Sequence, residues 1–279
     1  MRASWPCSAS WSFRRGRGRR VPEGSASLLD SVRHALVVHA HPDDEALAGG
    51  ALLRELHERG AKVTLVTCTR GELGEIVAGV LPADTSVADL ADVRERELRG
   101  SLDALGIDQH RWLGTPPARA EGLKVREYRD SGMRWLRPGL AGPADETDLR
   151  AFSVAPVEEV TADLAAVIAH DEPDLVISYD ATGGYGHPDH VRAREASLAA
   201  ARGAGVRFAE LVEQSERELA AEIGDLEWFD LEQHRDAVVA ALRSHRTQLT
   251  VDDDGSALVH SGGQRQDVHL AIGLREVVA

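Results

Sequence analysis

Cysteine is scarce in this sequence, and its scarcity limits the kinds of site that the chain can build. Only two cysteines occur among 279 residues, Cys7 near the start and Cys68 in the apolar segment KVTLVTCT. Two such cysteines exclude a disulfide framework and a zinc site made of cysteines. A thiol inside an apolar strand is more often a packing group than a nucleophile. Any metal must therefore be held by histidine and carboxylate side chains.

Long apolar runs are also missing, and so is an excess of positive charge. No apolar segment approaches the roughly 20 residues that a membrane span needs. The formal net charge is −14, although residues 1–20 carry six arginines and no acid. So acidic a chain is a poor match for nucleic acid or for an anionic membrane surface. We therefore expect a soluble, cytoplasmic protein with neither nucleic acid nor a membrane as partner.

The N-terminal segment, residues 1–30, lacks the continuous apolar core of a secretory signal. Its arginine-rich and serine-rich composition is compatible with an organelle transit peptide. It is more typical of a disordered extension, or of a start codon assigned too far upstream. We expect residues 31–279 to form a single domain.

From residue 32 onward the sequence alternates between strand-like and helix-like segments. Apolar, β-branched runs predict strands over 32–40, 62–69, 174–180 and 206–212. Apolar residues at helical spacing predict helices over 44–60, 87–105, 156–171 and 230–246. This alternation is typical of βα units around a mostly parallel sheet, so we expect an α/β fold. Residues 114–155 have no period and are typical of an active-site loop or of disorder, and residues 252–266 are expected to form a loop.

Two of the predicted strands lead into similar clusters of histidine and aspartate. The first runs into HPDD at 41–44, and DLVISYD is followed a few residues later by HPDH at 187–190. In an open parallel sheet, ligands bind beyond the carboxyl ends of the strands, so both clusters should face one crevice. Either motif alone could be a helix cap with surface acids. Two of them at the same edge of the sheet favour a functional site.

Each cluster carries a proline, Pro42 or Pro188, which suits the first turn of a helix because its φ is preset and its missing N–H is not needed there. Residues three apart in each cluster, such as His41 and Asp44, then point to one side of that turn. Converging imidazole and carboxylate groups are zinc ligands, although two histidines and one carboxylate also suit ferrous iron. Because hydrolysis needs no redox chemistry, zinc is the metal we expect.

The remaining histidines carry less information. His39 shares a pleat face with His41 and is either a supporting group behind the site or a packed core residue. Five others have no such context and are expected at the surface or in minor structural roles: His110, His170, His245, His260 and His269.

Five motifs in order along the chain resemble those of the PIG-L/LmbE-like deacetylases. They are AHPDDE, TRGELGE, RERELRGSLDALG, YRDSGM and YDATGGYGHPDH, within residues 33–250. The resemblance is strongest to the actinobacterial branch that contains the mycothiol-biosynthesis deacetylase and the mycothiol S-conjugate amidase. It implies a Rossmann-like, three-layer α/β fold and metal-dependent removal of an acetyl group from an N-acetylglucosaminyl substrate, a small amino-sugar molecule.

The resemblance also implies roles for individual residues. The expected metal ligands are His41, Asp44 and His190. Asp43 would be the general base that takes a proton from the attacking water. His187 would be the second catalytic group: oriented by Asp189, it would donate a proton to the leaving amine as an imidazolium. Tyr185 would lie beside the developing oxyanion. Glu45 is expected only in the first helical turn.

Three further residues are implied to bind the sugar: Arg94, Asp130 and Glu75. Without the resemblance, Arg94 would be interpreted as an exposed helix residue in an ion pair with Glu95 or Glu97.

The substrate stays open at this stage. The GGYGHPDH segment favours a deacetylase over the conjugate amidase, but residues 132–150 and 250–279 match nothing we can place in the biosynthetic deacetylase. An inositol-linked sugar, a thiol-conjugate amide and another acetylated sugar, such as an antibiotic intermediate, are the alternatives. A nucleotide-binding module is disfavoured, since no G-x-G-x-x-G follows the first strand and its acids would repel a pyrophosphate. A scaffold without catalysis would not need Asp43 or His187.

Overall fold

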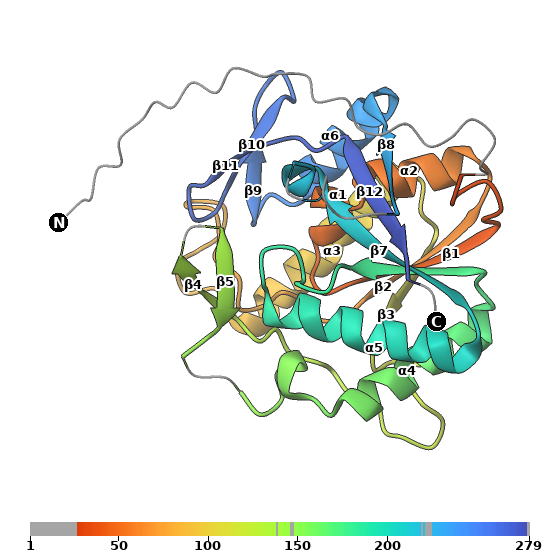
Figure 1. The fold of residues 1–279 in the computed structure, drawn as a ribbon. Coiled ribbons are helices and arrows are strands. Elements are labelled where there is room, and N and C mark those ends of the chain that lie inside the picture. The colour runs from red at the N-terminus through yellow and green to blue at the C-terminus, as the bar shows by residue number, and fades with distance from the viewer. Residues whose placement is uncertain (1–26, 138, 146–147, 219, 221–224, 278–279) are drawn as a thin grey trace.

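The computed structural model describes residues 27–137, 139–145, 148–218, 220 and 225–277. Most of the predicted N-terminal extension, residues 1–26, lies outside this part of the chain. The main sheet is built from β1 (His34–His39), β2 (Lys62–Thr67), β3 (Gln109–Trp112), β6 (Leu175–Tyr179), β7 (Arg207–Glu213), β8 (Leu226–Asp230) and β12 (Ala271–Glu276). Its strand order is β3-β2-β1-β6-β7-β12-β8, and Figure 1 shows the sheet with the elements around it.

Five neighbouring strands of this sheet are parallel: β3, β2, β1, β6 and β7. The strand β12 runs antiparallel to both of its neighbours, β7 and β8. The chain moves outward from β1 to β2 and β3, then returns to the other side of β1 with β6 and β7. The strand order therefore reverses between β1 and β6. Such a switch point leaves a crevice at the carboxyl ends of the two strands, where α/β proteins bind ligands.

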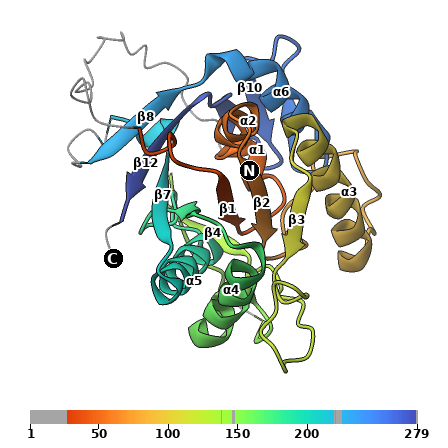
Figure 2. The same cartoon turned by 90° about the vertical axis from the view of Figure 1, so that its right-hand side faces the viewer.

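Helices cover both faces of the sheet, giving the three expected layers (Figure 2). On one face lie α2 (Gly50–Glu58), α3 (Val87–Leu105) and α6 (Arg235–Ser244), with the short α1 (Asp44–Leu47) leading into them. On the other lie α4 (Val157–Asp171) and α5 (Pro188–Ala204). Along β1, Val37 packs into the first core and Leu36 and Val38 into the second. A strand buried on both faces reads as the continuous apolar run seen in the sequence.

Most predicted elements are confirmed, with two differences near the first cluster and at the end of the chain. The helix expected over 44–60 is broken into α1 and α2 at Ala48 and Gly49. A Cβ on Gly49 would lie 2.9 Å from His39 Nε2, so the chain needs a glycine where it passes this buried ring. The helix expected from residue 230 begins at Arg235, because residues 226–230 form β8.

Residues 252–266, expected to form a loop, instead contribute two strands to a small antiparallel sheet. It consists of β9 (Leu249–Val251), β10 (Ala257–His260) and β11 (Arg265–Asp267). The irregular middle of the chain contains the hairpin of β4 (Met133–Arg137) and β5 (Leu140–Pro143). Among the described residues, no helix is long and apolar enough to cross a membrane.

Candidate active site

The two clusters meet at the switch point, but they fold differently. In the HPDH loop, residues 187–190, His187 is the N-cap of α5 and Pro188 follows in the first turn, as predicted. In the HPDD loop, residues 41–44, the helix begins only at Asp44, so the prediction that Pro42 lies in a first helical turn is wrong. The N-cap there is Asp43, whose φ of 117° is rare for a residue other than glycine.

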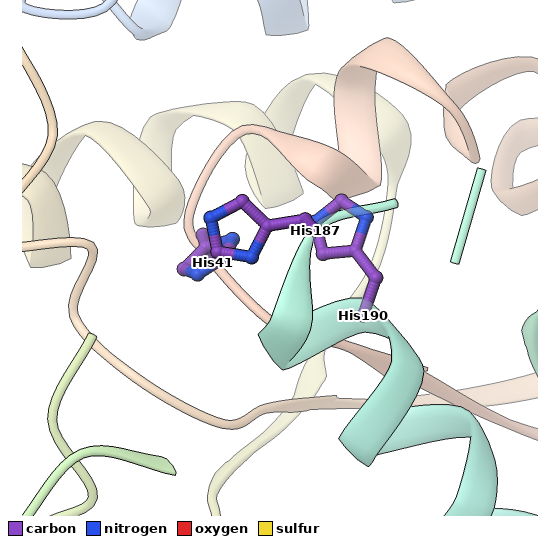
Figure 3. Close-up of side chains that lie close together, drawn as sticks. All are labelled: His41, His187 and His190. Carbon is purple, nitrogen blue, oxygen red and sulfur yellow. The ribbon is translucent and has the colours of Figure 1, made fainter. Parts of the chain in front are cut away.

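Three imidazoles gather where the loops meet, as Figure 3 shows. The ring centroid of His41 lies 4.6 Å from that of His187 and 5.4 Å from that of His190, and the latter two are 4.9 Å apart. Each offers one nitrogen such that all three nitrogens lie within 4.8 Å of one another. Because His41 follows β1 and the other two follow β6, the topology brings together residues almost 150 positions apart. The prediction that the two clusters meet at one edge of the sheet is confirmed.

Asp44 is held by a tyrosine that the sequence analysis did not single out. The Tyr179 hydroxyl donates to Asp44 Oδ2 at 2.7 Å and accepts from the Ala40 N–H at 2.7 Å. The His41 N–H donates to the same Oδ2 at 2.8 Å. The Tyr179 ring also stacks on His190 at 4.1 Å between centroids. Tyr179 ends β6 and so lies between the clusters, a position that only the strand pairing reveals.

The geometry around His190 fits a metal ion. His190 is 1% exposed, and within the described residues neither of its ring nitrogens has a hydrogen-bond partner. Its Nε2 lies 3.3 Å from Asp44 Oδ1, and His41 Nδ1 lies 3.4 Å from Asp44 Oδ2. Tetrahedral ligands at the usual zinc distances of about 2.0–2.1 Å are separated by about 3.3 Å. The two distances to Asp44 are therefore of the size that such a site requires. Two groups of possible metal ligands have their ligand atoms within 4.8 Å of one another, and both include His41: one adds His187 and His190, the other Asp130 and Asp189.

Asp189 supports a different histidine from the one predicted. Its carboxylate, fully buried, accepts from His41 Nε2 at 3.1 Å and from the Ser131 N–H at 3.0 Å, and the Ser131 hydroxyl also donates to it. His187 Nδ1 instead accepts the backbone N–H of Asp189 at 3.2 Å, because His187 caps the helix. The prediction that the Asp189 carboxylate orients His187 is thus corrected. The carboxylate lies behind His41, where it fixes the ring and leaves Nδ1 to face Asp44.

The two adjacent aspartates have opposite electrostatic surroundings. Burial opposes charge on Asp44, but His190 and His41 outweigh it and hold the pKa of this carboxyl well below its usual range. Burial and the charge of Asp44 raise the pKa of Asp43 to about 7. One acid is therefore suited to coordinate a cation and the other to exchange protons near neutrality.

The histidines differ in the same way. Burial lowers the pKa of His41, but its hydrogen bonds to Asp189 and Asp44 raise it well above the ordinary value. Burial, with His41 and His190 nearby, lowers the pKa of His187 to about 2. His187 is accordingly a neutral ring whose Nδ1 is occupied by an N–H donor, so its own proton is on Nε2. This differs from the imidazolium expected from the sequence.

Tyr185 reaches the cluster, as predicted. Its ring lies edge-on to His190 at 5.2 Å and to His187 at 6.1 Å between centroids. The β4–β5 hairpin fixes its backbone, since the Ala141 N–H donates to the Tyr185 carbonyl at 2.7 Å. Trp135 of the same hairpin lies beside the Tyr185 ring at 5.7 Å. The hairpin within the unassigned stretch 132–150 therefore forms one wall of the site.

The three residues predicted to bind the sugar lie in different environments. Arg94 is 2% exposed and donates to three carbonyls of the 71–75 loop, so the alternative of an exposed ion pair is wrong. Asp130 is buried with Oδ1 3.7 Å from His41 Nε2. Glu75 is exposed, and its carbonyl rather than its carboxylate contacts Arg94. The buried acid of this loop is Glu72, which accepts from the Asp130 N–H at 3.2 Å.

Two residues given minor roles from the sequence are fully buried beside the HPDD loop. His245 donates from Nε2 to Glu45 Oε1 at 2.6 Å, and both side chains are 0% exposed. The expectation of a surface His245 is therefore wrong. Neither residue stood out in the sequence, because a single histidine 200 positions away carries no spacing signal. His39 is also buried, edge-on to Tyr179 at 5.3 Å, and among the described residues its ring nitrogens have no partner.

A doubly covered parallel sheet with histidines and carboxylates clustered at its switch point defines an α/β protein with a candidate metal site. The chain belongs to the PIG-L family, described as GlcNAc-PI de-N-acetylase, whose match covers residues 36–201. The family resemblance predicted from the motifs is thereby confirmed.

Relatives of high similarity carry the name 1D-myo-inositol 2-acetamido-2-deoxy-alpha-D-glucopyranoside deacetylase, an enzyme that hydrolyses a C–N amide bond. One from Kineococcus radiotolerans is 38% identical over 88% of this chain and 78% of its own length. One from Nocardioides sp. is 37% identical over 82% and 87%. One from Mycobacteroides abscessus is 36% identical over 83% and 87%.

Solved structures confirm the fold at lower identity. The N,N'-diacetylchitobiose deacetylase of Pyrococcus horikoshii matches with a TM-score of 0.55 and 21% identity, over 80% of this chain and 73% of its own. A teicoplanin deacetylase in a zinc-inhibited form gives 0.56 and 18%, over 88% and 98%. A 4-carboxy-2-hydroxymuconate hydratase from Pseudomonas putida gives 0.55 and 18%, over 88% and 97%. Since a hydratase shares this fold, the reaction must be argued from the site.

Proposed function

We propose that this protein is a zinc-dependent deacetylase that hydrolyses the acetamide of an N-acetylglucosaminyl group linked to inositol. The observation that carries the proposal is the convergence of His41, Asp44 and His190 beside a second aspartate of raised pKa, Asp43. The inositol-linked substrate is supported by the names of the relatives that match along most of the chain. The predicted cytoplasmic location fits such a small-molecule substrate.

The proposed metal ligands are His41 Nδ1, the Asp44 carboxylate and a ring nitrogen of His190. Zn²⁺ held there would polarise the acetamide carbonyl and make a water molecule more acidic. Ferrous iron suits the same donors. Asp189 keeps the His41 ring in place through Nε2, and the Tyr179 hydroxyl keeps the Asp44 carboxylate in place through Oδ2.

The chain's own residues would then move the protons. Asp43, with a pKa of about 7, takes the proton of the attacking water. The Nε2–H of His187 and the hydroxyl of Tyr185 would donate hydrogen bonds to the oxygen that gains charge. The amine leaves only after it is protonated, and the proton that Asp43 has accepted is the one available in the site. His187 thus serves as a neutral donor in this proposal.

Sugar binding falls to the 71–75 loop and to Asp130. Asp130 lies between that loop and His41, and accepts the N–H groups of Leu73 and Gly132 at 3.3 and 2.8 Å. Its remaining acceptor capacity can take a sugar hydroxyl. Arg94 acts by holding the loop through its carbonyls, and the exposed Glu75 carboxylate is free to reach a substrate at the loop edge.

A substrate panel with a metal-depletion arm tests the proposal. We expect amine release from glucosaminyl-inositol acetamide to exceed release from N-acetylglucosamine and from a thiol-conjugate amide. Dialysis against a strong chelator should abolish it, and added Zn²⁺ should restore it. Full turnover with no metal bound would refute the metal mechanism. Preference for the thiol-conjugate amide would instead identify an amidase.

A further inference from the structure

The Glu45 carboxylate lies directly behind the HPDD loop and is fully buried. Its Oε2 accepts the Asp43 N–H at 2.9 Å. Its Oε1 accepts from the Ser101 hydroxyl at 2.5 Å and from His245 Nε2 at 2.6 Å. All three side chains, Glu45, Ser101 and His245, are 0% exposed. A carboxylate with this many donors and no contact with solvent has one fixed position.

The residue that Glu45 holds is in an unusual conformation. Asp43 has a φ of 117°, where a side chain other than glycine's is strained. Such a conformation persists only where the surroundings impose it, and it occurs at functional sites. The bond from Asp43 N to Glu45 Oε2 is the contact that fixes the N–H direction of this residue. Rotation about that backbone would move the Asp43 carboxylate.

The support for Glu45 comes from a distant part of the chain, the 245–248 turn that follows α6. His245 contacts Glu45, and the Gln248 side chain donates to the Pro42 carbonyl at 2.6 Å. Thr247 is in turn tied to Glu97 of α3 through its N–H and its hydroxyl, at 2.8 and 2.6 Å. The turn therefore contacts the residue before Asp43, Pro42, and the second residue after it, Glu45. It does so although it lies beyond residues 36–201, which the family model matches.

We propose that Glu45, supported by Ser101 and the 245–248 turn, is a positioning residue that holds Asp43 in the conformation needed for proton transfer. This rests on the proposed function, in which Asp43 is the base. The consequence is that a residue after the family match, His245, contributes to the rate although it does not touch the substrate.

The test compares Glu45→Gln with a matched control, Glu210→Gln. Glu210 is also buried, at 1% exposed, and accepts from two arginines, Arg194 at 2.5 Å and Arg275 at 3.0 Å, rather than from any group of the HPDD loop. Three donors point at Glu45, but a glutamine offers a single oxygen, so its amide nitrogen must face a donor. Both variants weaken one buried carboxylate network. Thermal unfolding and circular dichroism establish that each is folded.

For Glu45→Gln we expect kcat to fall by about tenfold or more, since small misplacements of a catalytic group have effects of this size or larger. KM and Zn²⁺ affinity, the latter measured by competition with a chromogenic chelator, should stay within about twofold. Glu210→Gln should keep the wild-type kcat. A wild-type kcat in Glu45→Gln, or an equal fall in both variants, would overturn the proposal.

Hydrogen–deuterium exchange gives a readout that needs no turnover. The peptide spanning residues 40–47 should exchange faster in Glu45→Gln than in wild type or in Glu210→Gln, because the Asp43 N–H loses its charged acceptor. Unchanged exchange would count against the proposal. If wild type releases no acetate, the proposed function has failed, and this measurement still decides whether Glu45 fixes the loop.

His245→Gln serves if Glu45→Gln does not fold. It removes one support of Glu45 and leaves the bond from Asp43 to Oε2, so we expect a smaller fall in kcat and a smaller rise in exchange of the same peptide. Wild-type values of both in His245→Gln would overturn the role of the 245–248 turn.

Discussion

The HPDD and HPDH loops have nearly the same sequence, but different kinds of interaction hold them in place. The HPDH loop is an ordinary helix start, with His187 as N-cap and Pro188 in the first turn, so its geometry follows from local sequence. The HPDD loop has a strained N-cap and depends on contacts from α3, from β6 and from the 245–248 turn. A short motif can therefore be positioned either by its own backbone preferences or by distant residues. The four predictions below test this contrast.

The largest effect is expected in the HPDD loop. Asp43→Asn keeps the size of the side chain and removes the base, so kcat should fall by about 10³-fold while Zn²⁺ is retained. Metal analysis of the purified variant and a kinetic assay check this together. Loss of the metal in this variant would show that the roles of the two aspartates have been exchanged.

His187→Ala tests the HPDH loop. Without the Nε2–H donor, kcat should fall by about 10²-fold. One ring nitrogen of His187 lies within 4.8 Å of a nitrogen of each of the other two histidines, so His187 is also placed where it can bind the metal. The Zn²⁺ affinity of the variant must therefore be measured together with its kcat. An unchanged affinity supports a donor role, whereas a large loss of affinity would make His187 a ligand.

Asp189→Asn tests which of the two loops the Asp189 carboxylate supports. The carboxylate belongs to the HPDH loop by sequence but supports His41 of the HPDD loop by contact. We therefore expect Zn²⁺ affinity to fall by about tenfold to a hundredfold, the usual range for a partner of a metal-binding histidine. A fall in kcat with no change in Zn²⁺ affinity would instead show that Asp189 acts through His187, as the sequence predicted.

Tyr179→Phe should have the smallest effect. It removes one hydroxyl that joins Ala40 to Asp44 and keeps the ring that stacks on His190. We expect a loss of about 2 kcal/mol in the free energy of unfolding, because two buried hydrogen bonds are lost and one of them goes to a charged carboxylate. Denaturant unfolding measures it. A stability equal to wild type would mean that water replaces the hydroxyl.

The sequence predicted what depends on local pattern and strand topology. Alternating apolar segments were enough for the α/β layers, and two clusters following apolar strands were enough to place His41, Asp44, His187 and His190 together. Interactions between distant residues were not predictable. Tyr179 and His245 belong to the surroundings of the HPDD loop because of strand pairing and of a turn 200 residues away, and neither has a neighbour in sequence that marks it.

Two predictions that rested on local sequence alone were wrong: the helix start at Pro42 and the loop near the end of the chain. A proline just before a helix-like segment favours a helix start, and only the tertiary contacts show that Pro42 lies outside α1. The strands β9 (LTV) and β10 (ALVH) are apolar but very short, β11 (RQD) is polar, and glycines and charges separate them, so the segment resembles a loop in sequence. Their pairing with one another, rather than their composition, makes them a sheet.

The position of β12 has a consequence for how the protein is made. This strand, the last described element of the chain, lies between β7 and β8 and pairs with both. During synthesis, β8 therefore has no partner in the main sheet until residues 271–276 have left the ribosome, although all the proposed metal ligands have emerged some 80 residues earlier. A nascent chain thus presents the proposed metal ligands on an incomplete sheet, and β12 adds its pairing with β7 and β8 only after those residues have emerged.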